Sequence, residues 1–375
     1  MHLPRYYSSL GQYLKPNKVL VIFGPRQAGK TTLIRDYLTN SPYRYKLESG
    51  DNLQTQAILG TPDSNHLKEY VSGYELLVVD EAQKIANIGV CLKILVDEVP
   101  GIKIIATGSS AFELAGQIGE PLTGRKLTLT LFPIAQLELL NVYNAFELKS
   151  KLEEWLIYGS YPEIVTAPTK PEKRLLINEI THSYLLKDIL ELDRIKNSKI
   201  LLDLLRLLAF QIGNEVSLSE LGKQLGIDYK TVARYLDLLE KSFVIYSVSG
   251  FSRNLRKEIR KKNKYYFYDL GIRNALIANF NDLALRDDIG KLWENFLVIE
   301  RLKKQTYHQI ISNNYFWRTW EKQEIDWVEE REGKLFGYEF KWKKDQAKIP
   351  TEWRENYKNS EFLLINQQNY LDFIT

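Results

Sequence analysis

Strand-like apolar runs alternate with helical segments along the first third of the chain. Short runs of this kind are typical of strands buried on both faces, and helices between them are typical of a parallel sheet with crossover connections. The pattern predicts an α/β domain, which we place at residues 1–146. The runs cover residues 18–23, 44–47, 75–79, 102–106 and 127–131.

Helical spacing dominates the segment that follows. Over residues 147–196, apolar side chains recur at i, i+3 and i+4, as at Leu152, Trp155 and Leu156. The stretch from Gly159 to Pro162 interrupts them with the composition of a turn. We predict a small helical unit here.

A helix-turn-helix pattern occupies residues 197–265. Ser217 or Ser219 is placed to cap the first helix, and Gly226 supplies the turn. A second apolar-faced helix and a strand-like run follow, so we predict a winged helix.

The last unit, residues 266–375, combines a helix with three strand-like runs. Period-two alternation sets Asp326 opposite its apolar neighbours in one run. In the next run, Glu339 and Lys341 share the face opposite Tyr338 and Phe340. The three charged side chains can therefore converge on adjacent strands.

The composition is typical of a globular protein with several domains. A chain of 375 residues with 44% apolar and 26% charged residues is long enough for two to four globular units. It has no 18-residue uncharged apolar stretch and no N-terminal signal pattern, so we expect a cytoplasmic protein with no membrane partner. One cysteine and four histidines exclude an intramolecular disulfide and a Cys/His zinc cluster. The net charge of +4 is too small to identify a partner.

The stretch GPRQAGKTT, which begins at Gly24, has the G-x-x-x-x-G-K-T form between a strand and a helix. In such a loop, backbone N–H groups surround the β-phosphate of ATP, Lys30 reaches the β- and γ-phosphates, and the Thr31 hydroxyl binds Mg²⁺. The residues that we assign to the nucleotide are Gly24, Arg26, Gln27, Ala28, Gly29, Lys30, Thr31, Thr32, Asp80, Thr107 and Ser109.

An acidic pair ends the third strand-like run. Burial of Asp80 and Glu81 at a strand end is costly unless they bind something charged. We expect Asp80 to hold Mg²⁺ and Glu81 to polarise the attacking water. Thr107 or Ser109 is placed either to sense the γ-phosphate or to cap the next helix.

Basic residues gather in the predicted winged helix. The second helix offers Tyr229, Lys230, Arg234 and Tyr235 outward, and seven positive residues stand against one acid between Ser252 and Lys264. We expect DNA contact through phosphate neutralisation, with a protein-docking or structural role as the alternative. The predicted DNA-binding residues are Lys230, Arg234, Arg253, Arg256, Lys257, Arg260, Lys261 and Lys262.

Several motifs together resemble those of prokaryotic AAA+ superfamily ATPases of the AAA_14 type that carry a C-terminal DUF4143 domain. The resemblance covers nearly the whole chain and implies a P-loop core with a helical lid. It also implies that Arg125 is an arginine finger or sensor, which acts on the γ-phosphate in cis or from a neighbouring subunit of a homo-oligomer; the alternative is a surface ion pair. The motifs are GPRQAGKTTL, LLVVDEAQ, IIATGSSAFEL, TGRKLTLTLFPI and LEEWLIYGSYPEIV.

The D-x(12)-E-x-K spacing from Asp326 to Lys341 resembles the PD-(D/E)xK nuclease superfamily. The resemblance implies a restriction-endonuclease-like α/β domain in which Asp326, Glu339 and Glu294 bind Mg²⁺ or Mn²⁺ and Lys341 activates the water that attacks DNA. Two alternatives stay open: the fold holds DNA without cleaving it, or the protein is a nucleotide-switched scaffold for protein partners.

Overall fold

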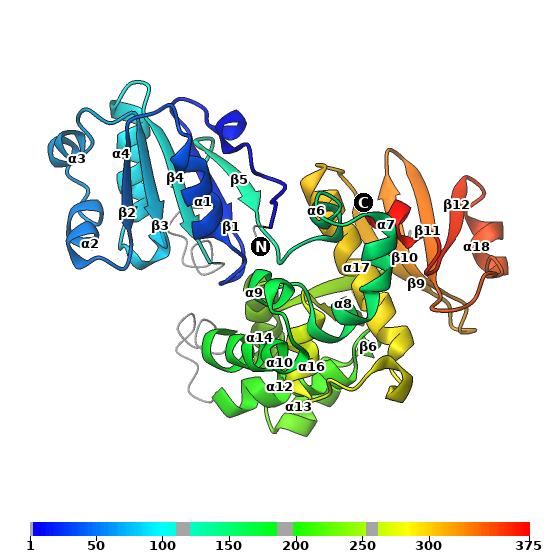
Figure 1. Cartoon of the computed structure of the whole chain (residues 1–375). Coiled ribbons are helices and arrows are strands. Elements are labelled where there is room, and N and C mark those ends of the chain that lie inside the picture. The colour runs from blue at the N-terminus through cyan, green and yellow to red at the C-terminus, as the bar shows by residue number, and fades with distance from the viewer. Residues whose placement is uncertain (1–2, 110–120, 186–197, 253–261) are drawn as a thin grey trace.

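The computed structural model describes residues 3–109, 121–185, 198–252 and 262–375. An α/β domain forms one side of the molecule, helices from the middle of the chain lie beneath, and a second sheet forms the other side (Figure 1). The α/β fold class is confirmed.

The N-terminal sheet has five parallel strands within the described residues, in the order β2-β3-β4-β1-β5. The central strands are buried on both faces, as their uninterrupted apolar sequences predict. Because β4 lies between β1 and β3, the carboxyl ends of these three strands are neighbours. The strands are β1 Val19–Phe23, β2 Tyr45–Ser49, β3 Leu76–Asp80, β4 Lys103–Gly108 and β5 Lys126–Thr130.

Helices and short turns connect these strands, and apolar clusters fill both faces of the sheet. They are η1 Leu10–Tyr13, α1 Lys30–Thr39, α2 Leu53–Leu59, α3 Ser64–Tyr70, η2 Ala82–Lys84 and α4 Ile88–Glu98.

The middle of the chain is helical and packs around α16, a helix from later in the sequence. The buried Asn274 side chain of α16 donates to the carbonyls of Leu156 and Ile157 in α8, at 3.0 and 2.8 Å. The first helices are α6 Gln136–Leu139, α7 Ala145–Ser150, α8 Leu152–Tyr158, α9 Pro162–Thr166, α10 Lys170–Glu179 and η3 Ile180–Leu185. The later ones are α12 Ser198–Phe210, α13 Leu218–Leu225, α14 Tyr229–Lys241, α16 Leu270–Leu276 and η4 Leu283–Leu285.

Helices α13 and α14 form the turn that the sequence indicates. The Ser217 side chain accepts a hydrogen bond from Glu220 N at the start of α13, and Gly226 ends that helix with φ of 69°. Asp228 caps α14 through the Lys230 and Thr231 N–H groups. Our placement of Tyr235 on the outer face is wrong, because its ring is buried in the core between α14 and its neighbours.

The second sheet is mixed and has seven strands in the part of the chain that the structure describes, in the order β12-β11-β10-β9-β7-β8-β6. Strand β7 pairs antiparallel with β8 and parallel with β9. The boundary that we placed after residue 265 falls inside β8, so the two predicted units share a strand. The strands are β6 Glu215–Val216, β7 Ile245–Gly250, β8 Asn263–Phe267, β9 Asn313–Arg318, β10 Glu324–Arg331, β11 Lys334–Phe340 and β12 Ser360–Ile365.

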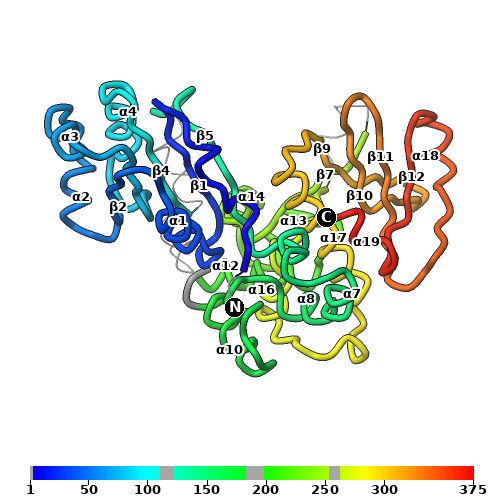
Figure 2. Tube along the Cα trace, turned by 45° about the horizontal axis from the view of Figure 1, so that its top comes forward, coloured from blue at the N-terminus to red at the C-terminus, as the bar shows by residue number. Residues whose placement is uncertain are grey.

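The long helix α17, Ile289–Tyr307, is almost entirely buried between this sheet and the middle helices. The short helix α18, Thr351–Asn356, packs Trp353 on the C-terminal strands, and α19, Tyr370–Ile374, packs Phe373 against Tyr338 of β11. Figure 2 shows the N-terminal segment running back from the α/β domain towards the middle of the molecule.

Arg5, in that segment, joins the two halves. Its guanidinium donates to the Ala28 carbonyl, to the Phe132 carbonyl at 2.6 Å and to Glu138 Oε1 at 3.0 Å. Its neighbour Tyr6 stacks on Tyr307 of α17, with ring centroids 4.9 Å apart. Since Arg5 and Glu138 are both buried, neither charge has water as a substitute for its partner.

We expect Arg5→Met to destabilise this junction by about 3–5 kcal/mol, because it leaves the Glu138 carboxylate buried and unpaired. Urea unfolding followed by tryptophan fluorescence measures the change. Lys170→Met is the control, since Lys170 pairs with Asp282 at the exposed surface and its loss should change the unfolding midpoint little. Equal unfolding curves for Arg5→Met and the parent protein would contradict the central role of Arg5.

Candidate functional site

The loop between β1 and α1 has the backbone shape that its glycines permit. Gly24 has φ of 152°, and a Cβ atom there would lie 2.0 Å from the Leu131 carbonyl oxygen. Gly29 has φ of 94° directly before the first turn of α1. The loop therefore curls over the N-terminal end of a ten-residue helix, where unpaired N–H groups favour an anion.

The Lys30 side chain is buried inside the curve of this loop. Its ammonium donates to the carbonyls of Gly24 at 2.8 Å and Pro25 at 2.9 Å. These bonds hold the positive charge beside the N-terminus of α1. A phosphate at the helix end would meet both the N–H groups and this ammonium.

Hydroxyl and carboxylate groups from three adjacent elements meet at the same edge. The Thr31 hydroxyl of α1 donates to Asp80 Oδ2 at 2.8 Å, and the Thr107 hydroxyl of β4 donates to Asp80 Oδ1. The Glu81 N–H donates to Thr107 Oγ1 at 3.0 Å. The Thr31 hydroxyl and the Asp80 carboxylate are oxygen ligands of the kind that Mg²⁺ takes, and they lie beside the phosphate-binding loop, so the donor set fits that ion.

Glu81 lies next to this group, and its backbone has a φ of 50°. Its carboxylate accepts from the Gln83 side chain at 2.6 Å, which fixes its orientation. A Cβ atom at Gly50 would lie 2.2 Å from the Glu81 carbonyl oxygen, so the neighbouring backbone confines Glu81 as well. The expected role of Glu81 in orienting the attacking water stays a prediction.

The other residues that we assigned to the nucleotide surround this edge. Ser109 is buried just after β4, Thr32 is exposed on α1, and Arg26 is half-buried in the loop. Gln27 has φ of 60°, and its buried Oε1 has no hydrogen-bond partner among the described residues. Their contacts with a nucleotide stay predictions.

Arg125 lies at the other end of the sheet. It directly precedes β5, and its carbonyl accepts from Val19 N at the start of β1, whereas the loop follows Phe23 at the far end of that strand. Five residues of strand separate the two ends by roughly 15 Å. Arg125 pairs with Asp97 at 2.6 Å on the surface. The expectation of an action in cis is therefore wrong, while an action on a neighbouring subunit stays a prediction.

In the second sheet, the predicted carboxylates do come together. Burial raises the pKa of Asp326 well above its ordinary value, and the nearby charges of Glu294 and Glu339 raise it further. Asp326 Oδ2 accepts from Phe340 N at 2.8 Å, and Glu339 Oε1 pairs with Lys341 at 2.5 Å. Glu300, by contrast, points elsewhere and accepts from Gln136 N at 2.6 Å.

Lys264 also belongs to this cluster, although the sequence groups it with the positive residues between Ser252 and Lys264. Its ammonium lies 3.2 Å from Glu294 Oε1 and 2.5 Å from Glu324 Oε1, and its side chain is 2% exposed. Burial raises the pKa of Glu294, but Lys264 and Lys291 outweigh burial and keep that pKa below its ordinary value. A period-two reading of the run Asn-Lys-Tyr-Tyr-Phe would have set Lys264 and Tyr266 on one face, and both side chains contact Glu294.

A divalent metal does not fit this cluster as it stands. Tyr266 and Lys264 donate to Glu294 Oε1, and Lys291 donates to Oε2 at 3.1 Å. Over residues 3–109, 121–185, 198–252 and 262–375, no three His, Cys, Asp or Glu side chains are arranged to hold a metal ion. The Mg²⁺ or Mn²⁺ that the nuclease resemblance implies therefore has no open ligand set here.

The structure describes some of the predicted DNA-binding residues. Lys230, Arg234 and Lys262 are exposed. The remaining ones lie outside the described residues: Arg253, Arg256, Lys257, Arg260 and Lys261.

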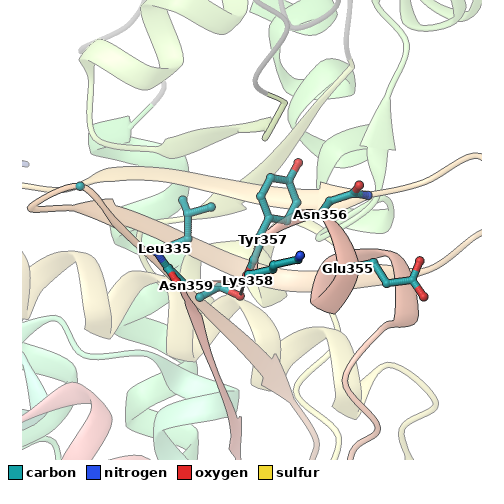
Figure 3. Close-up of a pocket in the computed structure, with 8 residues that line it drawn as sticks. Leu335, Glu355, Asn356, Tyr357, Lys358 and Asn359 are labelled. Carbon is teal, nitrogen blue, oxygen red and sulfur yellow. Dashed lines mark hydrogen bonds between the residues drawn. The ribbon is translucent and has the colours of Figure 1, made fainter.

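Figure 3 shows a different surface feature, a shallow hollow of about 240 Å³ beside β12, where Lys358 and Glu355 extend from a polar rim. Its mixed polar lining offers no convergent set of groups for catalysis.

Three families match successive parts of the chain. Residues 16–140 match the AAA domain, residues 149–283 match a domain of unknown function (DUF8612), and residues 289–371 match another (DUF4143). None of the helices that the structure describes is long and apolar enough to span a membrane.

Uncharacterized proteins from distant prokaryotes are similar over most of the chain. One from Mycobacterium tuberculosis is 27% identical over 328 residues, which cover 86% of this chain and 70% of the relative. One from Haemophilus influenzae is 27% identical, with 80% and 78% covered. One from Methanocaldococcus jannaschii is 24% identical, with 84% and 73% covered.

A solved structure described as Pif1 helicases on forked double-stranded DNA is 15% identical, with a TM-score of 0.27, over 48% of this chain and 52% of that chain. A protein from Vibrio cholerae gives a TM-score of 0.17 at 12% identity, over 95% of this chain and 96% of that one. Likenesses this weak carry no functional argument.

We expect Thr31→Ala and Asp80→Asn each to lower Mg²⁺-dependent ATP hydrolysis by about 10²-fold or more, because each removes a polar group that would position the ion and the phosphates. Phosphate release at saturating ATP measures the effect. Thr39→Ala is the matched control, since Thr39 lies at the far end of α1 and its hydroxyl donates to the Arg35 carbonyl within that helix. Unchanged turnover in Asp80→Asn would contradict the assigned site.

Proposed function

We propose that this chain, which belongs to the P-loop ATPases with an AAA domain and a C-terminal DUF4143 domain, hydrolyses ATP and uses the nucleotide state to control a DNA-binding C-terminal half. The observation that carries the ATPase proposal is the contact of Thr31, Thr107 and Asp80 beside the phosphate-binding loop. Three elements distant in sequence bring these groups to one edge of the sheet.

Each residue of this edge has a role in the proposed reaction. The Lys30 ammonium and the N–H groups at the start of α1 bind and orient the phosphates. Thr31 and Asp80 would hold Mg²⁺, which neutralises phosphate charge when bound. Glu81 orients the attacking water and draws its proton towards Oε1 or Oε2. Arg125 would act from a neighbouring subunit of a homo-oligomer.

The DNA-binding proposal rests on charge and exposure. Lys230 and Arg234 lie on the exposed side of α14, the helix that would enter the major groove of a winged helix. The sequence from 253 to 262 adds six more cations against one acid. Residues 147–196 would serve as the helical lid and residues 197–265 as the winged helix. The lid would transmit the nucleotide state to the DNA-binding surface.

A second candidate is a nucleotide-switched scaffold that binds protein partners, with a nuclease-like domain that is catalytically silent. The lysine contacts of Glu294 favour the silent form of that domain over metal-dependent cleavage. DNA binding, measured directly, separates the scaffold from the first proposal.

We expect binding of a fluorescent DNA duplex to weaken steeply as salt rises, because phosphate contacts release counterions. The variant Lys230→Glu/Arg234→Glu should bind more weakly at every salt concentration, with a salt slope reduced by about 2. Fluorescence anisotropy over a salt series measures both quantities.

The control is Lys18→Glu/Lys93→Glu, which makes the same charge change at exposed positions of the α/β domain. Equal weakening in the two double variants would point to net charge alone and count against α14. Absence of binding even at low salt would favour the scaffold.

A further inference from the structure

We propose that the Lys264 ammonium takes the place of the divalent metal in the carboxylate cluster of the C-terminal sheet, so that this cluster is held by a fixed internal cation. The proposal is independent of ATP hydrolysis and of DNA binding by α14, and its failure would leave both standing.

The Lys264 ammonium lies between two carboxylates, where a metal ion would bind its ligands. From β8 its ammonium reaches Glu294 of α17 at 3.2 Å and Glu324 of β10 at 2.5 Å. Tyr266, two residues along the same strand, donates to the same Glu294 oxygen at 2.8 Å. A metal ion would bridge carboxylates from a helix and a strand in this way, and here a lysine does so.

The charges around the cluster leave little need for another cation. Three ammonium groups, from Lys264, Lys291 and Lys341, lie against the four carboxylates of Glu294, Glu324, Asp326 and Glu339. A metal centre that uses several carboxylates relies on their unneutralised negative charge. A divalent ion beside the buried Lys264 would face strong repulsion, because buried charges are weakly screened.

Lys264 is also unable to leave easily. Its side chain is 2% exposed, and its ammonium lies 5.1 Å from the centre of the Phe316 ring. Moving it out would strip an ammonium of two carboxylates and leave Glu294 short of a partner in the interior, and both changes are costly. Glu339 Oε2 is a buried acidic oxygen without a hydrogen-bond partner among the described residues, and no three His, Cys, Asp or Glu side chains of those residues are arranged to hold a metal ion.

The test compares Mn²⁺ binding, measured by the loss of free-ion EPR signal, in nucleotide-free protein. All variants carry Thr31→Ala, which removes a ligand from the nucleotide edge. We expect Lys264→Met, which keeps the side-chain length and removes the charge, to bind Mn²⁺ about tenfold or more tightly than the parent. Adding Asp326→Asn to Lys264→Met should abolish that gain.

Lys291→Met is the matched control. Lys291 also contacts Glu294, but its side chain is 40% exposed and makes no ion pair with Glu324 among the described residues. We expect it to bind Mn²⁺ no more tightly than the parent. An equal gain in both variants would mean that net charge excludes the ion, and would overturn the assigned position of Lys264. A folded Lys264→Met protein with no gain would overturn it as well.

A second measurement needs no change at Lys264. The parent protein with Mn²⁺ should not nick supercoiled plasmid above the level of Asp326→Asn. Nicking or stoichiometric Mn²⁺ binding that is lost in Asp326→Asn would show a working metal centre and would overturn the proposal, whatever the stability of Lys264→Met.

Discussion

The Arg5 guanidinium is the interaction on which the arrangement of the whole molecule depends. It contacts the phosphate-binding loop at Ala28, the chain leaving β5 at Phe132, and the start of the helical region at Glu138. Because a buried guanidinium needs nearly all of its donors satisfied, these three segments are held in one geometry. A change in the loop on nucleotide binding would therefore shift the segments at Phe132 and Glu138, which lead into the rest of the chain.

Helix α17 extends that constraint to the far side of the molecule. Its last residue, Tyr307, stacks against Tyr6, and near its start Glu294 joins the lysine-bridged cluster. Between them, Glu300 pairs with Lys303, and Arg301 pairs with Glu329 of β10 at 2.6 Å. Buried ion pairs contribute little net stability but fix orientation, since breaking either partner is costly. One helix thus aligns the loop, the middle helices and the second sheet.

The features that the sequence predicts are those encoded locally. The loop at Gly24 to Thr32, the buried strands and the convergence of Asp326 with Glu339 follow from motif spacing and period-two alternation. Arg125 precedes β5 and so lies at the opposite edge of the parallel sheet from the loop after β1, which follows from strand direction and not from its motif, and the burial of Tyr235 depends on neighbours distant in sequence. The basic neighbours of Lys264 group it with the positive charges of the predicted winged helix, whereas its register in β8 turns its side chain inward.

The parallel pairing of β7 with β9 has a mechanical consequence. Ser249 and Gly250 pair with Tyr315 and Phe316, so the strands from β6 to β12 belong to one sheet. A hinge between the helix-turn-helix and the C-terminal strands would have to tear that ladder. We therefore expect the two regions to move together, so that a rotation of the sheet would carry α14 and the C-terminal strands through the same angle.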